Sequence, residues 1–229
     1  LTPEQIAGMS VDEINRTLRE ALDYDDYRYQ KEEGIRITES YRAEGLHKVL
    51  YQCPHCLTES KMASSGSELY CTACGKRWNW REDGCLEALE GETEFDHIPD
   101  WFEWERQQVA KQIDEGTYRF EDEVQVWSLP RVYRYIPLGK AKLTHDPENG
   151  FVITGHHRGQ DFRIQRTPKQ NNSLHIEYDY CYIRPEDCID ISTENDSFYC
   201  YPQTRTDVVT KLAFATEILY HRAKEKVTT

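Results

Sequence analysis

The sequence predicts an α+β chain of several modules, in which a small cysteine-rich module precedes about seven antiparallel strands and a closing helix. Three observations support this order. Two C-x-x-C motifs lie between residues 53 and 74, alternating apolar residues separated by turn signals follow Glu123, and apolar residues recur at helical spacing near the C-terminus.

Composition and charge exclude several classes of protein. The 229 residues carry 41 acidic and 28 basic side chains, a net charge of −13, which disfavours a general nucleic-acid binder. No run approaches the roughly 18–20 apolar residues of a membrane span, and the first residues lack a signal-peptide pattern. We therefore expect a cytoplasmic protein with reduced thiols. Because helix-like sequence begins at Leu1, we expect the chain to continue upstream in a longer polypeptide.

Residues 1–49 are predicted to form a helical connector or the tail of an upstream domain. Residues 10–13 have the S-x-x-E form of a capping box, and apolar residues recur every four positions from Ile14 to Leu22. A helix is therefore expected over about residues 11–24.

The strongest functional signal is the pair of C-x-x-C motifs in residues 50–90, which we call the cysteine module. Each motif can direct two thiolates to one cation, and four thiolates complete the tetrahedral shell of zinc. The ion is therefore expected to be structural and to stabilise a module too small to fold alone. The interval between the two pairs is slightly shorter than usual, but Gly75 after the last cysteine and the flanking aromatic positions resemble a rubredoxin-like zinc ribbon. Another metal or no metal is the alternative. The predicted ligands of one zinc ion are Cys53, Cys56, Cys71 and Cys74, while His55 is expected at the surface.

Cations and aromatic residues alternate from Lys76 to Arg81, a pattern that can stack on single-stranded bases. Trp78 and Trp80 would, however, point to the same face of a strand, where a small module needs hydrophobic cover. We therefore expect these tryptophans in a core or interface, with nucleic-acid contact as the alternative.

Residues 91–122 are predicted to form an acidic linker followed by a helix. Residues 91–123 alone carry a net charge of −8. A capping pattern at residues 100–103 precedes apolar residues that share one helical face from Phe102 to Ile113. We expect this helix to pack against a neighbouring module.

Residues 123–229, which we call the sheet module, alternate apolar and polar side chains. Asp207 is positioned to cap a final helix, along which apolar residues recur from Val208 to Leu219. This order resembles the pleckstrin-homology-like (PH-like) superfold, a bent seven-stranded antiparallel barrel that a C-terminal helix caps at one open end. The predicted strands are residues 124–128, 139–145, 150–155, 161–166, 174–183, 188–192 and 197–201.

Basic side chains are concentrated in the early strands of the sheet module. In a PH-like barrel the early strands and loops form a rim that receives anionic lipid headgroups in some members. A solvated strand face is the alternative interpretation. The candidate contacts with an anionic ligand are Arg131, Arg134, Lys140, Lys142, Arg158, Arg163 and Arg166.

The other reactive side chains suggest no catalytic set. His156 and Asp161 have the H-x4-D spacing of the glycerolipid acyltransferase pair, but no phosphate-binding E-G-T-R-like stretch follows them. We interpret this match as coincidence and predict no catalytic residue. Four cysteines without metal spacing are expected to be inert thiols: Cys85, Cys181, Cys188 and Cys200.

Nearly the whole chain resembles the C-terminal extension that follows the acyltransferase domain of some Firmicute 1-acyl-glycerol-3-phosphate acyltransferases. The resemblance implies that the catalytic motifs lie upstream of Leu1, so that only the four zinc cysteines carry over to this chain. The matching segments are RAEGLHKVLYQCPHC at 42–56, ETEFDHIPDWFEWER at 92–106, LGKAKLTHDPENGF at 138–151 and ISTENDSFYCYP at 191–202.

The resemblance implies a role in phospholipid biosynthesis. The parent reaction transfers an acyl group from a thioester to 1-acyl-glycerol-3-phosphate and yields phosphatidic acid. The chain is then a non-catalytic accessory region, with the upstream acyltransferase domain as partner and an anionic lipid surface at the inner face of the membrane as a further contact. A zinc-ribbon adaptor for nucleic acid or for another protein is the alternative.

Overall fold

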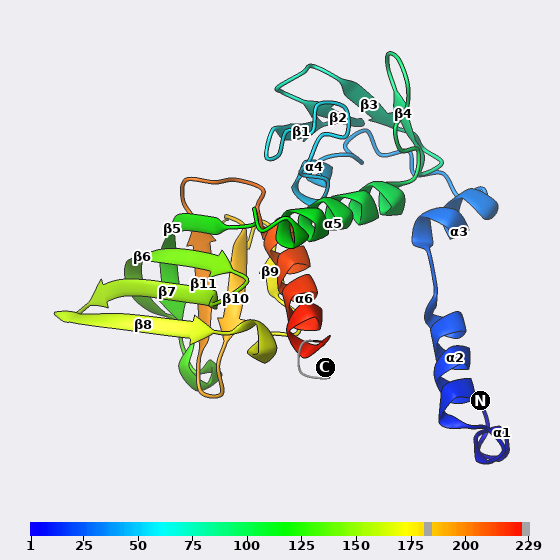
Figure 1. The fold of residues 1–229 in the computed structure, drawn as a ribbon. Helices are drawn as coiled ribbons and strands as arrows, with labels where there is room; N and C mark the ends of the chain where they lie inside the picture. Colours follow the sequence, from blue (N-terminus) through cyan, green and yellow to red (C-terminus); the bar gives the residue numbers. More distant parts are fainter. Residues whose placement is uncertain (181–184, 226–229) are drawn as a thin grey trace.

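The computed structural model describes residues 1–180 and 185–225 and shows an α+β chain with two antiparallel sheets (Figure 1). Cys181 and the 181–183 end of the fifth predicted strand lie outside the described residues. No helix in the two described ranges combines the length and the apolar character that crossing a membrane requires.

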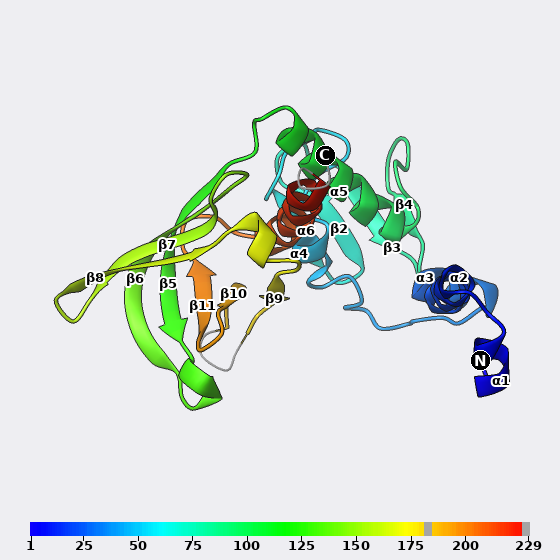
Figure 2. The same cartoon turned by 60° about the horizontal axis from the view of Figure 1, so that its bottom comes forward.

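The N-terminal segment extends away from the rest of the molecule and then returns to it (Figures 1 and 2). The predicted capping box is present, because the Ser10 and Glu13 side chains each accept a hydrogen bond from the other residue's backbone N–H. No residue of the first two helices is buried, whereas Gln30 in the third donates to the Glu82 carbonyl at 3.0 Å. The helices are α1 (Pro3–Ala7), α2 (Val11–Leu22), α3 (Asp26–Glu32) and α4 (Leu46–Val49).

The cysteine module contains a four-stranded antiparallel sheet in the order β1-β2-β3-β4. Leu69 pairs with Trp78 across the two central strands, and both side chains are fully buried. The core therefore lies on the face that Trp78 occupies. The strands are β1 (Met62–Ser65), β2 (Glu68–Cys71), β3 (Arg77–Trp80) and β4 (Leu86–Ala88).

Helix α5 (Ile98–Asp114) connects the two sheets and contributes to both cores. Trp101 is buried in the core of the cysteine module and Val109 in that of the sheet module, so the expected packing against a neighbouring module is confirmed. The predicted cap at Asp100 is wrong. Pro99 fits the first turn because its φ is fixed near the helical value, and the helix begins at Ile98.

The sheet module contains the seven predicted antiparallel strands, in the order β8-β7-β6-β5-β11-β10-β9. The first begins at Phe120, four residues earlier than predicted, and the described part of the fifth is only three residues long. Short 3₁₀ helices, η1 (Pro130–Val132) and η2 (Pro168–Gln170), lie in two connections. The strands are β5 (Phe120–Ser128), β6 (Ile136–Asp146), β7 (Gly150–His157), β8 (Gln160–Arg166), β9 (His175–Glu177), β10 (Cys188–Ser192) and β11 (Ser197–Pro202).

Helix α6 (Val209–Glu225) follows the last strand, as predicted, and packs against β9 and η2. Val209, Leu212 and Leu219 enter a core that includes buried residues of β5, β6, β7, β10 and β11. Asp207 lies two residues before the helix, where its carboxylate is 3.9 Å from His47 Nε2 of α4. The N-terminal end of α6 therefore lies next to α4 (Figure 1).

Candidate metal centre

The four predicted ligands converge on one point. Their Sγ atoms all lie within 4.8 Å of one another, and two of the separations are 3.8 Å (Cys53 to Cys74) and 3.7 Å (Cys56 to Cys71). These distances exclude disulfides, whose sulfurs are about 2.05 Å apart. A tetrahedral ion with metal–sulfur bonds of about 2.3 Å separates its sulfurs by about 3.8 Å, so the group can hold a metal ion.

The two C-x-x-C turns have the same backbone construction. In each turn the residue four positions after the first cysteine donates to that cysteine's carbonyl, from Leu57 to Cys53 and from Gly75 to Cys71, both at 2.9 Å. Both donors have positive φ, 63° for Leu57 and 81° for Gly75. Glycine adopts this conformation freely, whereas leucine is strained in it. The strain at Leu57 indicates that the first turn is fixed by its surroundings.

The ligands are arranged from the core outward. Cys53 and Cys71 are at most 1% exposed, whereas Cys74 is exposed and Cys56 is half-buried. Burial raises the pKa of the Cys53 thiol. Burial also acts to raise the pKa of Cys56, but hydrogen bonds from Thr58 and the neighbouring thiols lower it to about 6. Four protein ligands fill a tetrahedral shell, so the site suits a structural rather than a catalytic ion.

The segment from Lys76 to Arg81 contributes to the core and to surface ion pairs. Trp78 is fully buried, and its indole Nε1 donates to Glu94 at 3.2 Å. The same carboxylate lies 3.0 Å from Lys76 Nζ and 3.2 Å from His55 Nδ1, and His55 is exposed as predicted. The expected core position of Trp78 is therefore confirmed, and its ring has no face open for a base to stack on.

Helix α5 holds the backbone next to the first ligand, Cys53, an arrangement that the sequence does not predict. A carboxylate oxygen of Glu105 accepts from Gln52 N at 2.7 Å, and Trp101 Nε1 donates to Gln52 O at 3.0 Å. Glu105 is fully buried, and its second oxygen has no partner among the described residues. Burial raises its pKa well above the usual range. Trp101, Glu105 and Val109 are spaced four residues apart and therefore share one helical face, which is the sequence pattern that could have predicted the burial of Glu105.

The basic residues predicted in the sheet module are spread over it. Arg131 and Arg134 lie in the exposed β5–β6 loop and Arg158 in the β7–β8 turn, at the same end of the sheet. Arg166 lies at the opposite end of β8, eight residues and about 25 Å from Arg158. The three remaining side chains, Lys140, Lys142 and Arg163, lie between these ends on β6 and β8.

Acidic groups accompany part of this basic set. Lys142 Nζ is 2.7 Å from Glu121, and the His156 ring is 2.8 Å from Asp161 across the β7–β8 hairpin. His156 and Asp161 are 62% and 94% exposed, which gives the pair no enclosed site for a substrate. Cys188 and Cys200 are buried, and burial raises the pKa of the Cys188 thiol to about 12, in accord with inert thiols.

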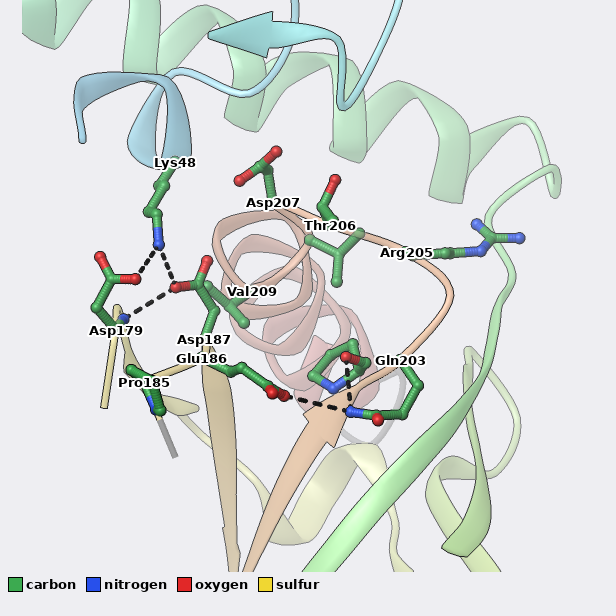
Figure 3. Close-up of a pocket in the computed structure, with 12 residues that line it drawn as sticks. Lys48, Asp179, Pro185, Glu186, Asp187, Gln203, Arg205, Thr206, Asp207 and Val209 are labelled. Atoms are coloured by element: carbon green, nitrogen blue, oxygen red, sulfur yellow. Dashed lines mark hydrogen bonds and ion pairs between the residues drawn. The ribbon is translucent and has the colours of Figure 1, made fainter. Parts of the chain in front are cut away.

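A polar cavity of about 350 Å³ lies between α4 and the sheet module (Figure 3). Lys48 Nζ bridges the carboxylates of Asp179 and Asp187, each at 2.7 Å. Burial lowers the pKa of Lys48, but these two carboxylates outweigh it and raise that pKa. Lys48 thus joins α4, which immediately precedes the cysteine module, to the sheet module.

No family model and no curated protein matches this chain.

Proposed function

We propose that the ion is zinc, that the cysteine module is a zinc ribbon, and that the sheet module is a PH-like domain. We propose further that the chain is the non-catalytic accessory region of an acyltransferase that makes phosphatidic acid. The observation that carries the first part is the convergence of four Sγ atoms with separations of 3.7 and 3.8 Å. One ion bound to four thiolates has this geometry, and zinc accepts such a set.

A structural role for the ion is supported by the small core around it. Ten buried residues form that core in the described chain, and two of them are the ligands Cys53 and Cys71. A core of this size stabilises a fold weakly without a metal or a disulfide. The zinc ion would then serve to hold the first cysteine turn and the part of α5 that packs on it in place.

The accessory role is supported by what the described residues offer chemically. His156 and Asp161 are 62% and 94% exposed, and burial raises the pKa of the Cys188 thiol, which disfavours the nucleophilic thiolate. Purified residues 1–229 should therefore transfer no acyl group from a thioester to 1-acyl-glycerol-3-phosphate. Turnover that disappears in His156→Ala would contradict this part of the proposal.

The lipid contact is supported by Arg131, Arg134 and Arg158, which share one exposed end of the sheet. We expect the chain to float with phosphatidylcholine vesicles that contain phosphatidic acid, and not with phosphatidylcholine alone. Arg131→Glu combined with Arg158→Glu should abolish flotation, while Arg16→Glu combined with Arg19→Glu on α2 should retain it. Equal flotation of the two variants would remove the lipid contact and leave the zinc assignment intact.

Helix α2 supports a second partner, the upstream domain of the same polypeptide. Its apolar side chains remain uncovered, with Val11 72% and Leu22 78% exposed. A longer polypeptide that includes the upstream domain should protect α2 from proteolysis. Cleavage of α2 at the same rate in both forms would contradict this contact.

A further inference from the structure

A second cavity, of about 320 Å³, lies where the two modules meet, and we call it the junction cleft. Its walls come from the loop before β1, the residues at the start of β5, the connection from β11 to α6 and the first turn of α6. The cleft is thus built from three regions that are distant in the sequence, residues 59–61, 119–120 and 204–211. Its charged lining residues are Glu59, Lys61, Arg119, Arg205 and Lys211.

The cleft is cationic, although the chain carries a net charge of −13. Lys211 Nζ is paired with Glu59 at 2.6 Å, and the other oxygen of Glu59 accepts from Gln112 at 2.8 Å. The remaining three cations, Lys61, Arg119 and Arg205, make no ion pair with any described residue. Three positive charges therefore line one cavity without an ion-paired carboxylate, although Arg119 also interacts electrostatically with Asp146.

The segment that carries Arg205 is held in place by a buried carboxylate. Asp122 of β5 is only 4% exposed and accepts hydrogen bonds from Arg205 N at 3.2 Å and from the Thr204 hydroxyl. The Arg205 guanidinium lies over the Phe120 ring at 5.6 Å. Figure 3 shows that it points away from Asp179 and Asp187. The backbone of Arg205 is thus held at the cleft before a ligand arrives, which lowers the ordering cost of binding.

Arginine and lysine together favour phosphate as the ligand. Two guanidinium forks can each donate two parallel hydrogen bonds to phosphate oxygens, and an ammonium adds a point charge. Val208 and Lys211 line the cleft, so the start of the 17-residue helix α6 brings the positive end of its dipole near it. A cavity of about 320 Å³ suits a compact anion, whereas the acidic surface repels an extended polyanion such as nucleic acid.

We propose that the junction cleft binds a phosphomonoester through Lys61, Arg119 and Arg205. This inference goes beyond the proposed function, because it involves neither the zinc site nor the arginines of the proposed lipid contact, Arg131, Arg134 and Arg158. Lys61 belongs to the cysteine module. Arg119 immediately precedes β5, and Arg205 lies in the connection between β11 and α6. A bound phosphate therefore bridges the two modules and couples their relative position to the ligand.

The test uses residues 1–229 in a nuclear magnetic resonance titration with inorganic phosphate, at an ionic strength held constant with chloride so that screening does not change. We expect saturable shifts of the backbone amides around Lys61, Arg119 and Arg205. Arg119→Gln combined with Arg205→Gln should weaken binding at least about tenfold, the effect of losing one or more charge-assisted hydrogen bonds. Arg16→Gln combined with Arg19→Gln removes the same charge from the distant helix α2 and should leave the affinity unchanged.

A second arm distinguishes a soluble phosphate from a lipid headgroup. Vesicles of phosphatidylcholine with phosphatidic acid replace inorganic phosphate. Flotation is compared for the wild type, the same two variants and the variant that combines Arg131→Glu with Arg158→Glu. The proposal is supported if the Arg119→Gln and Arg205→Gln variant alone loses the amide shifts or the flotation. Lost amide shifts indicate a soluble phosphate as ligand, and lost flotation indicates a lipid headgroup. No saturable response to either probe, or responses that the cleft variant retains, would overturn it. Flotation lost only in the Arg131→Glu and Arg158→Glu variant would leave the proposed lipid contact standing without the cleft.

Discussion

The cysteine module and the sheet module are stabilised by different means. Among the described residues, 21 buried side chains form the core between the seven-stranded sheet, α5 and α6, whereas ten form the core around the cysteines. The smaller core includes three residues from outside residues 50–90, Leu46, Ile98 and Trp101, and two of the proposed metal ligands. Apolar burial accounts for the larger fold, and a cation is needed to complete the smaller one.

The largest expected effect comes from removing a ligand that lies in the core. Cys71→Ser should abolish tight metal binding and unfold the cysteine module, because the binding energy of a structural zinc is on the order of 10 kcal/mol. Hydrogen exchange measured by mass spectrometry should show lost protection over residues 62–88 and retained protection over 120–180. Cys85→Ser is the control, since Cys85 is not a ligand. Equal loss of protection in both sheets would contradict independent stabilisation.

A cavity in the larger core should destabilise the sheet module and leave the cysteine module intact. Leu143 is fully buried and pairs with Ile153 across β6 and β7. Leu143→Ala should lower the free energy of unfolding of the sheet module by about 2–5 kcal/mol, as large-to-small core substitutions do. Urea denaturation measures the change, with the exposed Leu18→Ala as control. Zinc content should stay at the wild-type level, and its parallel loss would show that the two modules unfold as one unit.

Glu105 tests the helix that joins the modules. Its raised pKa means that the unfolded chain loses this proton at a lower pH than the folded chain does, so stability falls as pH rises through the unfolded value. Glu105→Gln removes the ionisation and can still accept from Gln52 N. The variant should be more stable than the wild type at pH 8, on the order of 1–3 kcal/mol, with a smaller difference at pH 5. Urea denaturation at the two pH values measures it, and a constant difference would contradict a buried carboxyl.

The smallest effect is expected at the exposed hairpin of the sheet module. His156→Ala removes an ion pair whose partners are 62% and 94% exposed. Such pairs contribute little, so the free energy of unfolding should change by less than about 0.5 kcal/mol. Thermal denaturation checks this. A larger loss would mean that the hairpin packs against something that the isolated chain does not show.

Local patterns predicted most of the fold. Strict alternation of buried and outward residues along β5 is a property of neighbouring residues, so it is readable without knowledge of the rest of the chain. The cysteine ligands were also predictable, because each turn brings together residues three positions apart. The start of α5 was misplaced since the capping pattern at residues 100–103 resembled a helix start more strongly than Pro99 did.

Features that depend on the contact between the two modules could not be predicted from the sequence. Lys61, Arg119 and Arg205 are separated by 58 and 86 residues and share no local pattern, so only the fold brings them to one cleft. Glu105 lies in an acidic segment whose composition predicts a solvent-exposed helix surface. It is buried because α5 lies between two cores and exposes little of this face.

A bound ion in the cysteine module is tested by the metal content of the freshly purified chain, measured together with its hydrogen exchange. We predict about one equivalent of zinc per chain. Removal by a chelator should expose the amides of residues 62–88 before those of 120–180, and restored zinc should reverse the change. A chain that protects residues 62–88 fully while it contains no zinc or other metal would contradict the claim that four thiolates and one ion complete this module.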